Sequence, residues 1–367
     1  MSVASVDLRA EYLQLQREID EALAEVVASG KFVLGPRVRR FEHEWAAHVG
    51  AQHCVGVANG LDALGIALRA VGVRRGDEVI VPSNTYIATW LAVTHCGATP
   101  VPVEPDPATF NIDPARIERA LSSRTAAIVP VHLYGQPADL TPIIELARAA
   151  RVRVVEDAAQ AHGAAYRGTP IGAHGDAVCW SFYPTKNLGA LGDAGAVTTD
   201  LGDVAERIRR LRNYGESAKN ENAVCGFNSR LDEVQAALLS VKLRYLDAAN
   251  ERRRQIAAHY TAALPSGQAL VLPMVPPWAQ PVWHQYVVRS RNRDEMRMRL
   301  RDRGVDTLIH YPTPPHRQPA YRGLGLVDGS LPISELIHRE VISLPINPHM
   351  SDDDVERVTS AVRLAVA

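Results

Sequence analysis

The sequence has few cysteines, and their spacing excludes two common kinds of site. Cys54, Cys96, Cys179 and Cys225 are scattered along the 367 residues, and none forms a Cys-x-x-Cys pair. This spacing argues against a zinc site and against a disulfide framework. We therefore expect no bound metal and a reducing, cytoplasmic location.

Long apolar runs and an excess of one charge are also missing. No run approaches the ~20 residues of a membrane-spanning helix, and the start, MSVASVDLRAEYLQLQREID, has no apolar segment of a secretory signal. The formal net charge of -1 produces no global field that would favour nucleic acid or an anionic membrane. We expect a soluble protein that binds neither.

Lysine is scarce as well. It occurs only at Lys31, Lys186, Lys219 and Lys242, and arginine supplies the rest of the 40 basic residues. Few side chains are therefore available for amine chemistry.

What the first half does contain is an alternation of short apolar runs with amphipathic segments. The expected strands are Cys54–Ala58, Glu78–Val81, Thr99–Val103, Ala126–Val131, Arg153–Glu156, Ala177–Phe182 and Ala196–Thr199, and the expected helices are Leu61–Val71, Thr85–His95, Pro114–Leu121 and Leu140–Ala150. Continuous β-branched runs are typical of strands buried on both faces of a mostly parallel sheet. The pattern predicts an open α/β domain with helices on both faces, and ligands at the carboxyl ends of the strands.

The second half predicts a smaller domain. An Ala/Leu-rich segment from Leu231 to about Leu264 is expected to be a helical connector, and several prolines follow it. The remainder, with Trp283–Arg289, Asp294–Arg303, Ile333–His338 and Ser351–Val366, is typical of a small α+β domain. We expect a large domain over residues 1–245 and a small C-terminal domain over residues 246–367.

Three features fall at the ends of expected strands. The first is the Asn59-Gly60 turn in CVGVANGLDALGIAL, where Gly60 permits close backbone approach and the start of the next helix offers free N–H groups to a phosphate. A plain helix cap is the alternative.

The second feature is the acidic pair Glu156 and Asp157 in VRVVEDAAQAHGA, which ends a Val-rich run. An acid at a buried strand end is costly unless a cation or hydrogen-bond donor meets it. A protonated pyridine nitrogen would be such a partner, and so would a structural salt bridge.

The third feature is Lys186 in CWSFYPTKNLGALGDAGAV, five residues after Ser181. A lysine amine condenses with an aldehyde when desolvation or a neighbouring positive group leaves it partly deprotonated. A solvated surface charge is the ordinary alternative, but the apolar flanks and the scarcity of lysine favour chemistry here. An anion cradle, an acid for a ring nitrogen and an amine for an aldehyde match the three handles of pyridoxal 5'-phosphate (PLP).

These motifs carry a family resemblance. SFYPTKNLGALGDAGAV, with EDAAQAHGA before it and GFNSRLDEVQAALLSVKL after it, resembles the DegT/DnrJ/StrS family of sugar aminotransferases. The N-terminal region and the HYPTPPH segment are also similar to that family, so the resemblance spans essentially the whole chain. It implies a fold-type I PLP enzyme that forms a homodimer with active sites at the subunit interface.

The resemblance also implies roles for single residues. Lys186 would bind the cofactor covalently and act as the general base, and Asp157 would pair with the pyridine nitrogen. The other cofactor contacts would come from Gln160 to the phenolic oxygen, from Gly60, Leu61 and Ser181 to the phosphate, from Asn228 of the neighbouring subunit to the phosphate, and from Tyr86 by stacking on the ring. For Tyr86, core packing is the alternative.

Substrate contacts are expected from a wider set. His310, Tyr311 and His316 lie in a proline-stiffened loop that suits sugar or diphosphate binding, although a structural turn would have the same sequence. Tyr183, Tyr214 and Lys31 are further candidates, and Arg230 could bind a carboxylate or pair with Asp232.

The resemblance implies transfer of an amino group from L-glutamate to a nucleotide-linked keto-sugar. YPTKNLGALGDAGA is similar to the subgroup that acts on C3 of thymidine diphosphate (dTDP) 6-deoxyhexuloses, although a glycine common in that stretch is Ala194 here. Relatives that act on C4 tend to have a Thr-Thr-x-Glu-Gly-like stretch, which this chain lacks. A dehydratase branch has histidine in place of Lys186.

Two alternatives remain open, and a third is disfavoured. One is the same chemistry at C4 of a 6-deoxyhexulose or at C3 of a UDP-linked N-acetylated sugar. Another is a PLP-binding regulator without catalysis, which Lys186, Asp157 and Gln160 argue against. A nucleotide-binding Rossmann module is disfavoured, because no Gly-x-Gly-x-x-Gly follows the first strand.

Overall fold

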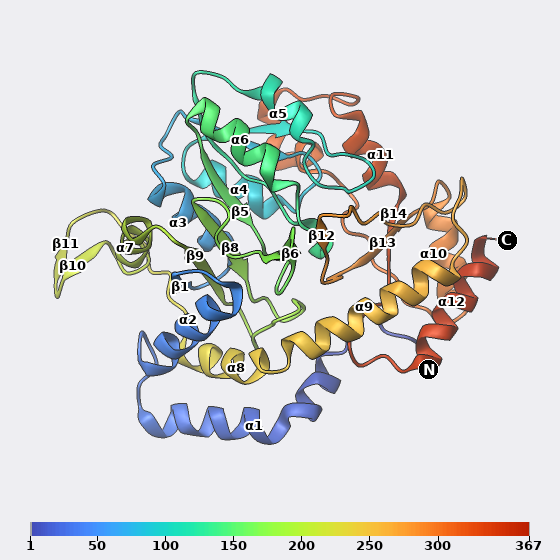
Figure 1. Cartoon of the computed structure of the whole chain (residues 1–367), viewed down its shortest axis with the longest axis horizontal. Helices are drawn as coiled ribbons and strands as arrows, with labels where there is room; N and C mark the ends of the chain where they lie inside the picture. Colours follow the sequence, from blue (N-terminus) through green and yellow to red (C-terminus); the bar gives the residue numbers. More distant parts are fainter. Residues whose placement is uncertain (1, 367) are drawn as a thin grey trace.

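A seven-stranded sheet forms the centre of the molecule in the computed structural model, which describes residues 2–366 (Figure 1). Its strand order is β1-β9-β8-β5-β4-β2-β3. Only β9 runs antiparallel to its neighbours, so the other six strands share one direction. The strands are β1 (His53–Val57), β2 (Glu78–Pro82), β3 (Thr99–Val103), β4 (Thr125–Ile128), β5 (Arg153–Asp157), β8 (Ala177–Ser181) and β9 (Gly195–Thr199).

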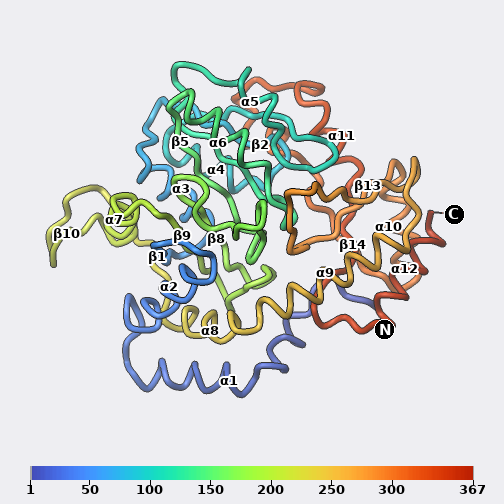
Figure 2. Tube along the Cα trace, in the orientation of Figure 1, coloured from blue at the N-terminus to red at the C-terminus, as the bar shows by residue number. Residues whose placement is uncertain are grey.

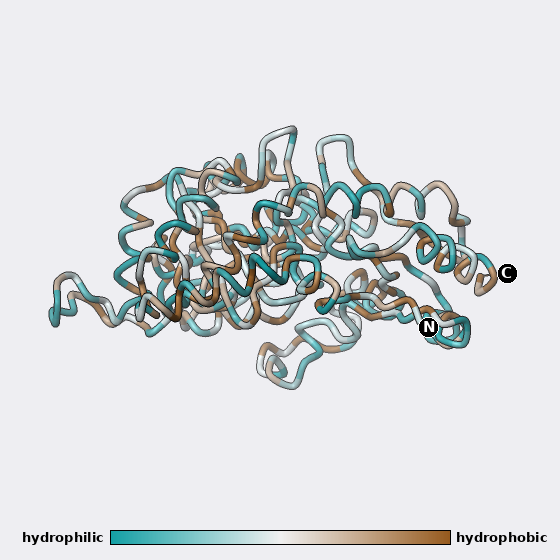
Figure 3. The backbone as a smooth tube through the Cα atoms, turned by 90° about the horizontal axis from the view of Figure 1, so that it is seen from below, coloured by the Kyte–Doolittle hydropathy of each residue, from teal (hydrophilic) through white to brown (hydrophobic). Residues whose placement is uncertain are grey.

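Helices cover both faces of this sheet, as the sequence predicts. Neighbouring strand residues point to opposite faces: Val155 packs in a cluster with α3, α4 and α7, whereas Val154 packs in one with α5 and α6. Further along the second face, Trp180 packs with residues of α2 and α8. These helices are α2 (Pro36–Val49), α3 (Gly60–Ala70), α4 (Ile87–His95), α5 (Pro114–Ala120), α6 (Leu140–Ala150), α7 (Gly202–Leu211) and α8 (Glu233–Leu243). Hydrophobic residues accordingly gather towards the middle of the molecule in Figure 3.

The expected connector is two helices rather than one. Helix α8 ends at Leu243 and α9 (Leu246–Ala263) begins after a break at Arg244 and Tyr245. The break follows the change of partners, because α8 packs against α1 (Leu8–Ser29) and α2 while α9 packs against the C-terminal helix α12 (Asp352–Val366).

A separate apolar cluster holds most of the C-terminal part together. It joins α9 and α12 to the antiparallel pair β13 and β14. Val3, near the N-terminus, belongs to the same cluster and bridges to Val305. The elements of this part are β13 (Tyr286–Arg289), α10 (Arg293–Asp302), α11 (Pro332–Glu340) and β14 (Val341–Leu344). We propose that the boundary between the two domains lies at the break after α8.

Short elements complete the chain. The hairpin of β10 (Glu216–Ala218) and β11 (Glu221–Asn222) extends from one side of the molecule, while both ends of the chain lie on the other (Figures 1 and 2). The remaining pieces are β6 (Ala165–Tyr166), β7 (Thr169–Pro170), β12 (Ala279–Gln280) and three short 3₁₀ helices over Leu133–Gly135, Pro315–Arg317 and Pro319–Leu324. Within residues 2–366, no helix has the length and apolar character needed to cross a membrane.

Candidate active site

The carboxyl edge of the sheet brings the three sequence features together. Asp157 is the last residue of β5 and Ser181 the last residue of β8, and these two strands are parallel neighbours. Gly60 begins α3, shortly after the end of β1, which runs in the same direction on the other side of β9. Parallel strands present their carboxyl ends at one edge, so these residues share one site.

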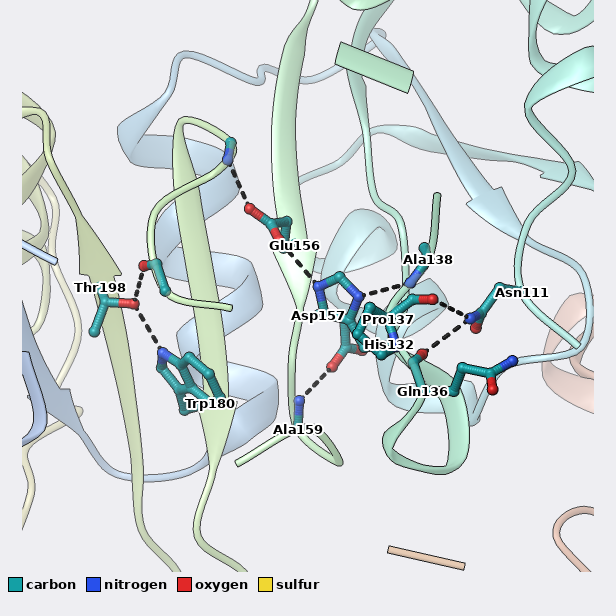
Figure 4. A network of polar contacts seen from close by, with 12 residues as sticks. Asn111, His132, Gln136, Pro137, Ala138, Glu156, Asp157, Ala159, Trp180 and Thr198 are labelled. Carbon is teal, nitrogen blue, oxygen red and sulfur yellow. Dashed lines mark hydrogen bonds and ion pairs between the residues drawn. The ribbon is translucent and has the colours of Figure 1, made fainter. Parts of the chain in front are cut away.

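Asp157 is a buried carboxylate with hydrogen-bond donors on both oxygens. Thr89 Oγ1 donates to Asp157 Oδ2 at 2.8 Å, and the Ala159 N–H donates to Oδ1 at 3.2 Å (Figure 4 shows the second contact). Burial raises the pKa of Asp157, and these two donors, with the electrostatic influence of Lys186 and His132, oppose that rise. A partly compensated acid of this kind is suited to pair with a further cation.

Behind Asp157, a second buried acid has its own partners. Glu156 Oε2 lies 3.0 Å from His132 Nε2, and Glu156 Oε1 accepts from the Gly175 N–H (Figure 4). Because His132 Nδ1 accepts from the Ala138 N–H, the ring hydrogen is on Nε2 and points to Glu156. Of the two acids in the motif, Glu156 is therefore bound to structural partners, whereas Asp157 is the one whose charge influences Lys186.

Lys186 lies half-buried in the loop after β8, where its N–H donates to the Tyr183 carbonyl at 2.8 Å. Burial lowers the pKa of Lys186 to about 8, and the charge of Asp157 opposes that change. The pKa of His310 is lowered to about 4, by burial first and then by the charge of Lys186. The Lys186 amine therefore lies within electrostatic reach of both the acid and the late loop, and near neutral pH it can gain or lose a proton.

The turn before α3 approaches Ser181 closely. A Cβ on Gly60 would lie 2.5 Å from Ser181 Cβ, so no larger residue fits here without movement. The Asn59 side chain accepts from the Asp62 N–H and caps the helix. The amides of Gly60 and Leu61 have no acceptor inside the helix, since they open its first turn. These two N–H groups beside a serine hydroxyl form a cradle for an anion.

Gln160 and the late loop form the remaining wall. Gln160 Oε1 accepts from the Tyr134 N–H at 2.6 Å, and its Nε2 donates to Tyr311 Oη at 2.9 Å. The ring of Tyr311 lies 5.1 Å from that of Tyr86, and the Tyr134 hydroxyl donates to the His310 carbonyl. Tyr86 is largely exposed, so its face is free to contact a ligand rather than filling the core.

Comparison with known proteins decides the family. The DegT/DnrJ/EryC1/StrS aminotransferase family matches residues 13–363. The chain belongs to this family.

Individual relatives are similar over their full length. The chain is 52% identical, over 99% of both chains, to the "Erythromycin biosynthesis sensory transduction protein EryC1" of Saccharopolyspora erythraea. It is 52% identical, over 97% of this chain and 98% of the other, to the "dTDP-3-amino-3,6-dideoxy-alpha-D-galactopyranose transaminase" of Aneurinibacillus thermoaerophilus. Among solved structures, Streptomyces venezuelae DesV in complex with a ketimine intermediate superimposes with a TM-score of 0.98, at 50% identity, and the match covers 100% of this chain and 98% of DesV.

Membership confirms the expected reaction class and cofactor. The protein is a PLP-dependent aminotransferase of fold type I. The residues on the carboxyl edge fit this cofactor, because the Gly60 and Ser181 cradle suits its phosphate, Asp157 suits its ring nitrogen and Lys186 suits its aldehyde.

Two expected site residues flank the hairpin of β10 and β11. Tyr214 and Asn228 are exposed, and the guanidinium of Arg230 lies 5.4 Å from the centre of the Tyr214 ring. Arg230 also donates to Asn213 Oδ1 at 3.0 Å, so its contacts are with this segment rather than with Asp232. Asn228 is followed by Ser229, whose Oγ accepts from the Ala58 N–H at 3.2 Å, next to the turn that precedes α3. The role of Asn228 in a neighbouring site stays a prediction.

Other substrate candidates differ in their surroundings. Lys31, between α1 and α2, and Tyr183, beside Lys186, are exposed and free to meet a ligand. His316 is almost fully buried, and its Nε2 lies 3.2 Å from Glu335 Oε1 on α11. These contacts favour a role in anchoring the loop over direct sugar binding.

Sequence reasoning missed a polar network that anchors the residue after Lys186. Asn187 Nδ2 donates to Asn250 Oδ1 and to the Val282 carbonyl, which leaves Asn187 Oδ1 to accept from His284 Nδ1 at 3.1 Å. This network ties the lysine loop to α9 and to the start of the C-terminal sheet. Asn187 lies in the same motif as Lys186, but nothing in the sequence of that motif indicates partners more than sixty residues away.

Proposed function

We propose that this protein transfers the amino group of L-glutamate to C3 of a dTDP-linked 3-keto-6-deoxyhexose, giving a dTDP-3-amino-3,6-dideoxyhexose. The reaction class rests on the meeting of Lys186 and Asp157 at the carboxyl edge of the sheet. The sugar rests on the stretch after Lys186, and on similarity to a transaminase named for a 3-amino-3,6-dideoxy sugar.

Binding of the cofactor is assigned to residues of several elements. Asp157 keeps the ring nitrogen protonated, Gln160 meets the phenolic oxygen, and Tyr86 stacks on the ring. Gly60, Leu61 and Ser181 bind the phosphate. When bound, PLP supplies an electron sink that stabilises negative charge on the carbon attached to the transferred nitrogen.

Proton transfer is assigned to Lys186. With a pKa lowered to about 8, its amine is partly deprotonated at neutral pH and can accept a proton from the donor carbon. The same group then returns a proton on the sugar side. His310, Tyr311 and Tyr183 are assigned to orient the keto-sugar around this amine.

We further infer a homodimer in which Asn228 and Lys31 act on the neighbouring site. Large apolar side chains are exposed on the segments that carry them, including Phe32, Val33, Tyr214 and Phe227. A contact between two copies would remove these side chains from water.

The proposal is tested by product analysis with a panel of keto-sugars. The protein is incubated with PLP, L-glutamate and a dTDP-3-keto-6-deoxyhexose, a dTDP-4-keto-6-deoxyhexose or a UDP-linked 3-keto N-acetyl sugar, with Lys186→Ala as the matched control. We expect mass spectrometry to detect the amine only from the first sugar and only with Lys186 present. Preferential conversion of another sugar would replace the assigned substrate.

A regulatory role is the second candidate, because one similar protein is named for sensory transduction. Lys186 favours catalysis, since its pKa, lowered to about 8, lets the amine accept and return a proton during turnover. Absence of turnover with every sugar, in protein that binds PLP, would favour the regulator.

A further inference from the structure

A chain of two buried hydroxyls leads to the Asp157 carboxylate. Thr89 Oγ1 donates to Asp157 Oδ2 at 2.8 Å, and Thr85 Oγ1 lies 3.0 Å from Thr89 Oγ1. Both threonines are at most 2% exposed. A hydroxyl has one hydrogen, and that of Thr89 goes to the carboxylate. Thr85 is therefore the donor in its contact with Thr89, and the chain has one direction.

The same stretch of sequence carries the exposed aromatic of the site. Tyr86 caps α4 and Thr89 lies three residues later, so about one helical turn separates them. One element thus presents an aromatic ring to the site and a hydroxyl to the acid.

The surroundings of Asp157 show why this hydroxyl matters. Oδ1 has only the longer contact, 3.2 Å, with the Ala159 N–H. The other charged or titratable groups that interact with Asp157 are Lys186, His132, Tyr311 and Cys179. Burial raises the pKa of Asp157, and the hydrogen bond from Thr89 is the strongest influence that opposes it.

We propose that Thr89 is a positioning residue for transamination: its hydroxyl, oriented by Thr85, keeps the Asp157 carboxylate ionised and turned towards the ring nitrogen of PLP. The inference rests on the role of Asp157 proposed above. A hydroxyl that donates to a carboxylate favours its charged form, and a donor behind that hydroxyl strengthens the bond. Without it, the buried acid would hold its own proton and protonate the ring nitrogen less fully.

The test compares Thr89→Val, which removes the hydroxyl at similar volume, with Thr89→Ser, which keeps it. Thr94→Val is the matched control on α4, because the Thr94 hydroxyl contacts the Trp90 carbonyl and Tyr321 instead of Asp157. The readouts are the nitrogen chemical shift of ¹⁵N-labelled PLP in the loaded protein, the dissociation constant of PLP, and kcat with KM for the keto-sugar.

We expect Thr89→Val to shift the ring nitrogen signal towards the unprotonated form. It should also lower kcat by about tenfold, because one hydrogen bond to a charged group is lost, and KM should change little. Thr89→Ser and Thr94→Val should resemble the wild-type protein. An unchanged nitrogen signal and kcat in a folded Thr89→Val protein would overturn the proposal.

Two further variants make the outcome decisive. Thr85→Val should shift the nitrogen signal in the same direction but less, and it carries the test if Thr89→Val does not fold. In an Asp157→Asn background, Thr89→Val should have no further effect. A repeated loss there would show that Thr89 acts by packing. If Asp157→Asn alone left the nitrogen signal and turnover unchanged, the role proposed for Asp157 would be wrong. That outcome differs from an unchanged Thr89→Val protein, which would refute only the role of Thr89.

Discussion

Lys186 and Asp157 shift each other's pKa without forming an ion pair. Asp157 raises the pKa of Lys186 and Lys186 lowers that of Asp157, yet no Lys186 ion pair within 4.0 Å occurs in the described residues 2–366. The proposed roles, in which the two groups bind different atoms of one ring, need this kind of separation. A direct salt bridge would neutralise both, and its rupture would be needed before cofactor could bind.

This relationship predicts how cofactor attachment depends on pH. Because the Lys186 pKa is lowered to about 8, the ammonium form predominates below that pH and the reactive amine above it. The initial rate of covalent attachment to apo-protein, followed by visible absorbance after mixing with PLP, should rise with pH, with its midpoint near pH 8, and level off at higher pH. Removing the Asp157 charge in Asp157→Asn should move the midpoint to lower pH. A midpoint near that of free lysine, or an upward move in the variant, would contradict the assignment.

The close approach of Gly60 to Ser181 predicts a sharp difference between two glycines of α3. Gly60→Ala would place a methyl group 2.5 Å from Ser181 Cβ, spread the cradle and weaken PLP binding. We expect the dissociation constant to rise about tenfold or more, since displaced phosphate donors cost at least one hydrogen bond. Gly65→Ala meets nothing within 4 Å and should leave PLP affinity unchanged. It should also raise stability, by up to ~1 kcal/mol. Equal effects of the two substitutions on affinity would argue against the cradle.

The exposed position of Asn228 predicts complementation between subunits. If the protein is the proposed homodimer, Lys186→Ala and Asn228→Asp chains that are co-expressed with different tags should form hybrid dimers. One site of each hybrid has both native residues if Asn228 acts across the interface. With random pairing, about a quarter of all sites should then be active. Purified hybrids should therefore turn over, although each parent is inactive or strongly impaired. Hybrids with no activity beyond that of the parents would place Asn228 in its own subunit's site.

The burial of His316 predicts a structural effect of its removal. His316→Ala removes the contact with the partly buried Glu335, so the free energy of unfolding should fall by ~2 kcal/mol. KM for the keto-sugar should change little in the folded fraction. Glu335→Gln, which weakens the same contact from the other side, should show the same pattern in a thermal melt. A raised KM with an unchanged melting temperature would restore His316 to the substrate site, as first expected from the sequence.

Much of the site could be recognised in advance because its signals are local. The strand that ends at Asp157 and the loop that carries Lys186 both follow from short runs of apolar residues, and the sheet order then brings their ends together. The strand boundaries were also close: the first strand begins at His53 instead of Cys54, and β4 covers Thr125–Ile128 instead of Ala126–Val131. Beyond Ile128, Val131 makes only an isolated parallel bridge to Asp157.

Residue patterns read along the chain were thus enough to predict the strands and to single out the amine, the acid and the turn before α3 as candidates, since each of these signals depends on near neighbours. Only the tertiary structure determines which side chains surround these residues. Thr89 reaches Asp157 across 68 positions, and His284 reaches Asn187 across 97. Such pairs are selected by how helices pack on the sheet, where a buried polar atom must find whichever partner the packing brings within reach. The broken connector has the same origin, because α8 and α9 bury their apolar residues against different neighbours.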